Sequence, residues 1–183
     1  MVSWDGVRER LAELAAADPG FERFGANRHE YRLGPPLPRA ELAEFEARHG
    51  VTLPEDYRDF LLTVGGHGAG PYYGLYSLGA PECPDEDEWR AGFLSTPFPH
   101  TSGWNRAEHH PVDNEIPDDR YFDQRWITGS LNVAHFGCGA YFRLVVAGPE
   151  RGRVWFDDRA SDGGISPSDL HFREWYLEWL NQP

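Results

Sequence analysis

The segment between residues 109 and 119 concentrates the side chains best able to bind a metal ion and activate water. His109 and His110 are adjacent, and the acids that follow them are Asp113, Glu115, Asp118 and Asp119. Zinc or manganese would need imidazole nitrogen and carboxylate oxygen atoms that converge on one point. Adjacent side chains of an extended segment point in opposite directions, and the sequence contains neither His-Glu-x-x-His nor His-x-His. A solvated polar loop is therefore expected, and a metal-assisted hydrolase using His109 or His110 is the distant alternative.

Cys138 is the candidate nucleophile, because His135 stands three residues before it. A catalytic thiol needs a nearby imidazole or another cation that lowers its pKa. Cys138 lies between two expected strands, where a small residue packs well, so a buried thiol is expected instead. Serine offers no alternative, because the sequence has no Gly-x-Ser-x-Gly nucleophile motif.

Two glycine-rich stretches could be mistaken for ligand-binding loops. Residues 65–70 follow a helix instead of preceding one, and they lack the lysine and hydroxyl of a phosphate-binding loop. Residues 157–164 lack the ligand spacing of a calcium loop. Their acids Asp157, Asp158 and Asp162 form either an acidic rim of the sheet suited to a basic partner or a solvated turn. We therefore expect no catalytic residue, no cofactor and no bound metal.

The charge balance is the feature that favours a protein partner. The chain has 30 acids against 17 bases, all of them arginine, and its formal net charge is −13. Such a surface repels nucleic acid and anionic membranes and attracts basic proteins, although acidity also serves solubility. The candidate partner contacts are acids together with two tryptophan anchors: Glu82, Asp85, Glu86, Asp87, Glu88, Trp89, Trp104, Asp157, Asp158 and Asp162.

Length and composition predict one domain over residues 1–183, with an irregular acidic and proline-rich insertion at about residues 81–128. A chain of 183 residues, 40% hydrophobic, can bury one ordinary core. No stretch approaches the roughly 18 apolar residues of a membrane helix. The N-terminus lacks a cationic region followed by an apolar run, and Cys83 and Cys138 form no Cys-x-x-Cys pair. A cytoplasmic location is therefore expected.

The first half of the chain is predicted to be mainly helical. The pattern predicts a first helix capped by Ser3 and ending before Asp18, an extended segment over residues 21–31, and a second helix over residues 39–49 ended by Gly50. A third helix begins at Pro54, and a left-handed turn at Gly65 and Gly66 ends it. Its apolar stripe comprises Tyr57, Phe60, Leu61 and Val64.

Strands dominate the second half. Residues 73–78, 131–135, 141–147 and 153–157 are expected to be extended, and residues 148–152 form a hairpin loop. A final helix over residues 168–181 carries an aromatic face: Phe172, Trp175, Tyr176, Trp179 and Leu180. Residues 92–125 are expected to form a long loop with isolated helical turns. Aromatic residues near this loop either cover the core or form a patch for a partner: Trp89, Phe93, Phe98 and Trp104.

Together these segments resemble the SUKH superfamily of Smi/Knr-type domains. The resemblance rests on residues 37–46, the Leu53-Pro54 helix and residues 70–75, 136–142 and 152–155. The family usually has Asn-Gly-Gly after the helix, whereas this chain has Gly-Gly-His at residues 65–67. The resemblance implies an α+β domain in which N-terminal helices and a C-terminal aromatic helix pack on a mainly antiparallel sheet.

Many bacterial members of the superfamily neutralise secreted toxins, so the resemblance implies a non-catalytic immunity protein. With the acidic balance, it predicts a protein that occludes the basic surface of a cognate toxin, such as a nuclease. The alternative is an intracellular regulatory or scaffold protein, as are the eukaryotic members, which act in cell-wall and signalling control.

Overall fold

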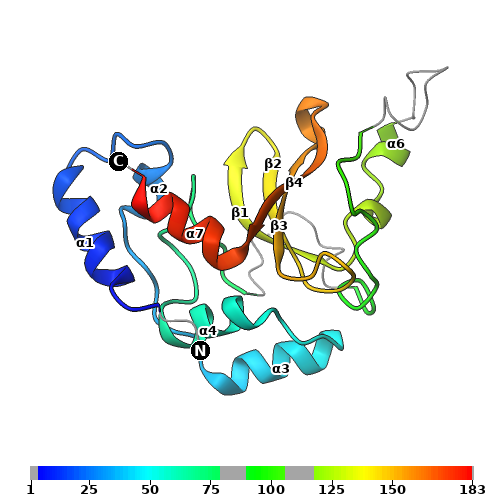
Figure 1. Ribbon diagram of the computed structural model, residues 1–183, viewed down its shortest axis with the longest axis horizontal. Helices are drawn as coiled ribbons and strands as arrows, with labels where there is room; N and C mark the ends of the chain where they lie inside the picture. Colours follow the sequence, from blue (N-terminus) through cyan, green and yellow to red (C-terminus); the bar gives the residue numbers. More distant parts are fainter. Residues whose placement is uncertain (1–3, 79–89, 106–117, 183) are drawn as a thin grey trace.

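The computed structural model describes residues 4–78, 90–105 and 118–182, and within this part the chain has an α+β fold. Four antiparallel strands follow one another across one sheet: β1 Ser130–Gly137, β2 Ala140–Val145, β3 Arg153–Asp158 and β4 Gly164–His171. The helices are α1 Val7–Ala17, α2 Ala26–His29, α3 Arg39–His49, α4 Glu55–Thr63, α6 Asp118–Tyr121 and α7 Phe172–Asn181, and the 3-10 turns are η2 Gln124–Trp126 and η3 Arg159–Ser161. In Figure 1, α1, α2 and α7 lie on one side of the sheet, and the segment with α6 lies on the other. No described helix has the length and apolarity needed to cross a membrane.

The helix predicted over residues 39–49 is confirmed as α3. Leu42 and Phe45 are buried beneath it, and Gly50 ends it in a left-handed conformation with φ 64°. α1 begins at Val7 after Gly6, while the expected cap Ser3 lies outside the described residues.

The helix after Pro54 is also confirmed, but its end differs from the prediction. Neither Gly65 nor Gly66 adopts a positive φ. A Cβ at Gly65 would lie 2.9 Å from the carbonyl oxygen of Gly34 and 3.2 Å from Cβ of Leu33. Gly65 is therefore required by close packing against a crossing segment, which the local sequence could not reveal.

The aromatic face of α7 joins the helices to the sheet. The Phe172 ring centroid lies 4.7 Å from that of Tyr57, and the Tyr176 centroid lies 4.7 Å from that of Phe60. On the sheet side, Trp175 lies 5.3 Å from Phe142 of β2. Each such aromatic pair contributes about 0.5–1.5 kcal/mol beyond its buried area. The predicted aromatic stripe is thus confirmed as the centre of the core.

Three segments differ from their predicted conformations. Residues 164–171 form strand β4, so the final helix begins at Phe172 and not at residue 168. Pro167 is tolerated there because β4 is an edge strand. Residues 73–78 form only isolated bridges through Leu75, because positive φ values of 56° at Tyr72 and 92° at Gly74 interrupt the extended chain. Residues 21–31 contain the short helix α2 instead of an extended segment.

The described part of the expected insertion packs on the second face of the sheet. Phe93, Phe98 and Tyr121 are buried, and the Phe98 ring lies 5.0 Å from that of Trp155 on β3. Trp104 exchanges two backbone hydrogen bonds with Ile165 of β4, of 2.8 and 2.7 Å. Phe93, Phe98 and Trp104 therefore cover the core and do not form a surface patch for a partner.

His29 is a buried neutral histidine that ties α2 to α7. Only 7% of the residue is exposed, and its ring lies 5.7 Å from that of Trp179. The backbone N–H of Tyr31 donates to Nδ1 of His29 at 3.0 Å, so this nitrogen must remain unprotonated. Burial is the main cause that lowers the pKa of His29 to about 4 from 6.5.

We expect this histidine to make the domain less stable in weak acid. As pH falls from 6.5 to 4, the unfolded chain takes up the His29 proton before the folded chain does, and stability falls by up to about 3 kcal/mol. Urea unfolding at pH 7 and pH 5 should show about 2 kcal/mol of this loss. His29→Gln should flatten the pH dependence, because the substituted side chain does not titrate. An equal slope in His29→Gln and the parent would contradict the assignment.

Candidate partner-binding surface

Most of the contacts predicted from the sequence lie outside the described residues. This applies to the acidic run and the first tryptophan anchor: Glu82, Asp85, Glu86, Asp87, Glu88 and Trp89. It also applies to the residues considered for a metal, His109, His110, Asp113 and Glu115, to the side chains of Asp118 and Asp119, and to Cys83. Within the described part, no three His, Cys, Asp or Glu side chains come together in a group that could hold a metal ion.

Trp104 is not placed as a surface anchor. Only 4% of it is exposed, and its ring stacks on Trp126 at 4.7 Å and on Tyr121 at 5.4 Å. Its role in the described structure is to fill the space between the sheet and the segment that covers it. The local sequence could not predict this packing, because the residues that contact Trp104 are distant from it in sequence.

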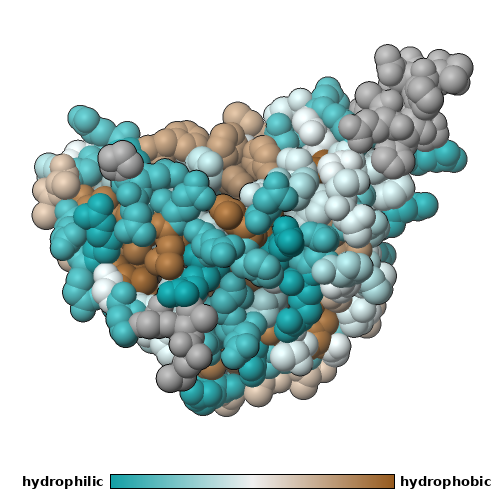
Figure 2. Space-filling view, in the orientation of Figure 1, coloured by the Kyte–Doolittle hydropathy of each residue, from teal (hydrophilic) through white to brown (hydrophobic). Residues whose placement is uncertain are grey.

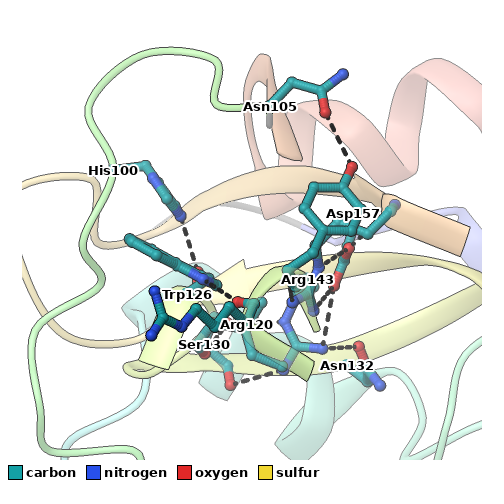
Figure 3. Close-up of polar contacts among 11 residues, drawn as sticks. His100, Asn105, Arg120, Trp126, Ser130, Asn132, Arg143 and Asp157 are labelled. Atoms are coloured by element: carbon teal, nitrogen blue, oxygen red, sulfur yellow. Dashed lines mark hydrogen bonds and ion pairs between the residues drawn. The ribbon is translucent and has the colours of Figure 1, made fainter. Parts of the chain in front are cut away.

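Asp157 is likewise buried, and it serves as the counter-charge of two arginines, of which Figure 3 labels Arg143. Arg159 binds it in a bidentate manner, with Nε 2.7 Å from Oδ1 and Nη2 2.8 Å from Oδ2. Arg143, with no exposed side-chain surface, lies 4.0 Å from Asp157 and donates to Asn132 Oδ1 at 2.6 Å. The acidic rim expected at residues 157–164 is thus reduced to half-buried Asp158 and exposed Asp162.

Phe24 is the most exposed of the large apolar residues described, at 54%. Its ring lies on three other aromatic rings, 5.9 Å from Tyr72, 5.3 Å from Tyr73 and 5.7 Å from Phe136. We call these four residues the aromatic surface. It differs from a solvated turn because the exposed ring of Phe24 packs against three other aromatic rings.

A groove of about 310 Å³ lies beside the aromatic surface, between Phe24 and α7. Buried rings of Phe142 and Trp175 form its floor, and Tyr72 stacks on Phe142 at 5.0 Å with an angle of 6° between the rings. Charged side chains stand at its edges, Arg23 from the segment before α2 and Glu178 from α7. The groove therefore combines aromatic walls with both signs of charge.

Gly25 sets the position of Phe24 against Tyr72. It adopts φ 83°, and a Cβ built on it would lie 1.9 Å from the carbonyl oxygen of Tyr72. The turn that carries Tyr72 is fixed to the sheet, because the N–H of Tyr73 donates to His135 O at 3.2 Å. The aromatic surface is thus held by backbone contacts on both of its sides.

Cys138 lines a groove together with Tyr73 and is exposed, so the prediction of a buried thiol is wrong. Cys138 and Gly139 form the two-residue turn between β1 and β2, with φ values of 51° and 80°. His135 packs between Tyr73 and Tyr141, at 5.5 and 5.0 Å, and no hydrogen bond between described atoms joins it to Cys138.

A second apolar area reaches the surface between α1 and α7 (Figure 2). These helices contact each other, and each contributes a partly buried leucine to the core, Leu14 and Leu177. This area is the outer edge of the core. Among the described residues, none of its apolar side chains is as exposed as Phe24. The aromatic surface and its groove remain the better candidate for binding.

The model of the SMI1/KNR4 family (SUKH-1) matches residues 36–178. The match includes the sheet, the groove floor and Glu178, but Phe24 and Gly25 precede it. No curated protein matches the chain, and no solved structure matches it.

Gly25→Ala is expected to destabilise the domain far more than Gly6→Ala. Both glycines precede helices with similar φ values, 83° and 79°, but a Cβ at Gly6 would have no atom within 4 Å. Gly6→Ala should therefore cost only about 1–2 kcal/mol for the left-handed backbone. Gly25→Ala adds a clash with Tyr72, and chemical denaturation should show a clearly larger loss. Equal losses would contradict a positioning role for Gly25.

Proposed function

The chain belongs to the SMI1/KNR4 family (SUKH-1), and from this premise we propose that it is a non-catalytic domain that binds another protein. The observation that carries the proposal is the display of Phe24, 54% exposed, on the packed rings of Tyr72, Tyr73 and Phe136. Exposed apolar patches commonly mark interaction sites, and aromatic residues dominate the energetics of interfaces. A rigid aromatic base also reduces the entropy lost on binding.

The partner that best fits the charge of the chain is a basic protein, and we propose a bacterial toxin such as a nuclease. A net charge of −13 would accelerate encounter with a basic surface and would disfavour nucleic acid. The proposed biological role is therefore immunity, by occlusion of the basic surface of the toxin.

Identification of the partner tests this role directly. The chain is used to capture proteins from the cells that produce it, and mass spectrometry identifies the partner. A basic toxin whose activity is blocked by the chain would support immunity. A cell-wall or signalling protein as the partner would instead support a regulatory role of the Smi/Knr type.

Phe24→Ser is expected to weaken partner binding at least about 10-fold, as loss of an aromatic hot spot does. Its melting temperature should fall only modestly, because 54% of Phe24 is already exposed in the folded chain. Phe122→Ser is the matched control, since Phe122 is 45% exposed and belongs to the opposite part of the molecule around α6. Calorimetry with the captured partner measures both affinities. A similar affinity for the two variants would remove Phe24 from the interface.

Charge reversal at Asp85, Glu86, Asp87 and Glu88 tests the acidic contacts predicted from the sequence. Exchange of these residues for arginine should slow association steeply at low salt and much less at high salt, because steering charges act on the association rate. Stopped-flow mixing with the captured partner measures the rate. Reversal of Glu41 and Glu44 on α3 serves as a control, and equal slowing by both variants would indicate a general effect of net charge.

A further inference from the structure

We propose that the groove between Phe24 and α7 is a slot for one arginine side chain supplied by the partner. This inference rests on the proposed protein-binding function and adds to it the chemistry of the group that the groove receives. At about 310 Å³ the groove lies at the lower end of the range of ligand pockets, which suits a side chain better than a cofactor.

The walls of the groove are aromatic and close to one another. Tyr72 and Phe142 are stacked at 5.0 Å, and Trp175 lies 5.3 Å from Phe142. Aromatic faces attract cations, and the planar guanidinium of arginine stacks on them better than the compact ammonium of lysine. Tyr72 and Trp175 both line the groove, so a guanidinium that entered it would lie beside aromatic rings.

Of the two charged side chains at the edges of the groove, Arg23 is held at Trp179, and Glu178 is the one that can receive a cation. Glu178 is exposed at the edge of the groove, and no hydrogen bond or ion pair with another described residue occupies its carboxylate. Its negative charge acts on the phenol of Tyr72, whose pKa is raised first by burial and second by Glu178. The Glu178 carboxylate and the aromatic walls thus line the same groove. One guanidinium could therefore donate a hydrogen bond to the carboxylate and stack on a ring at the same time.

Arg23 does not fill this position, because it is bound at the end of the groove near Trp179. Its Nη2 donates to Trp179 O at 2.5 Å, and its guanidinium lies 5.1 Å from the centroid of the Trp179 ring. The charge of Arg23 also acts on Asp18, whose pKa is lowered chiefly by the hydrogen bond from Tyr31 and to a smaller extent by Arg23. Arg23 therefore shows that α7 accepts a guanidinium on its aromatic face, and it leaves Glu178 available for a second one.

The chain of 183 residues can be tested with small probes before the partner is known. N-acetyl-L-arginine amide is titrated against the ¹⁵N-labelled protein, and N-acetyl-L-citrulline amide serves as the neutral probe of nearly the same shape. We expect saturable NMR shifts at the indole N–H of Trp175 and Trp179 with a millimolar Kd, since one side chain supplies only about 4 kcal/mol. The citrulline probe should bind at least about 10-fold more weakly, because only the arginine probe is charged.

Glu178→Gln should weaken binding of the arginine probe about 5- to 10-fold and leave binding of the citrulline probe unchanged. Glu41→Gln, at an exposed acid of α3, should alter neither titration. Equal binding of the two probes, or the absence of saturable shifts at Trp175, would overturn the arginine slot. Partner binding that is lost in Phe24→Ser but kept in Glu178→Gln would also overturn it, while the proposed protein-binding function would stand.

Discussion

The aromatic face of α7 contacts both the N-terminal helices and the sheet, and so holds these two parts of the chain together. Phe172 and Tyr176 pack among Tyr57, Phe60 and Trp4 on the helical side, while Trp175 packs on the sheet. Both Phe172 and Tyr176 are fully buried, and the hydroxyl of Tyr176 donates to Ala69 O at 3.0 Å. Because Trp175 and Trp179 also line the groove, the same helix that closes the core builds the candidate binding site.

The second face of the sheet depends on charge and not on apolar contact alone. Arg143 and Arg159 are buried there with Asp157 between them, and Asn132 and Ser130 accept hydrogen bonds from Arg143. Such clusters contribute little net stability, yet loss of the single carboxylate would leave two buried cations without their counter-charge. Arg159 also donates to Tyr121 O at 3.1 Å, so the cluster fixes the covering segment to the strand beneath it.

The aromatic surface assembles residues from three separate segments, and this explains why sequence reasoning missed it. Tyr72, Tyr73 and Phe136 fall within segments that carry the family resemblance, but Phe24 lies in a short mixed stretch with no apolar period. The Phe24-Gly25 pair was the available signal, because a glycine after an aromatic residue can mark a close backbone approach. The acids proposed from the sequence were chosen by charge alone, and of the three at residues 157–162 one proved to be buried.

The sequence by itself determined α3, α4, strands β1 to β3 and the aromatic stripe of α7, because periodicity, helix-ending glycines and turn residues act over a few positions. It also determined the acidic balance and the family. Only the tertiary structure decided that residues 164–171 pair as an edge strand, that Trp104 and Asp157 are buried, and that Cys138 is exposed. These outcomes depend on which distant segments cover each residue, and burial of a side chain is a property of its neighbours in space, which local sequence does not encode.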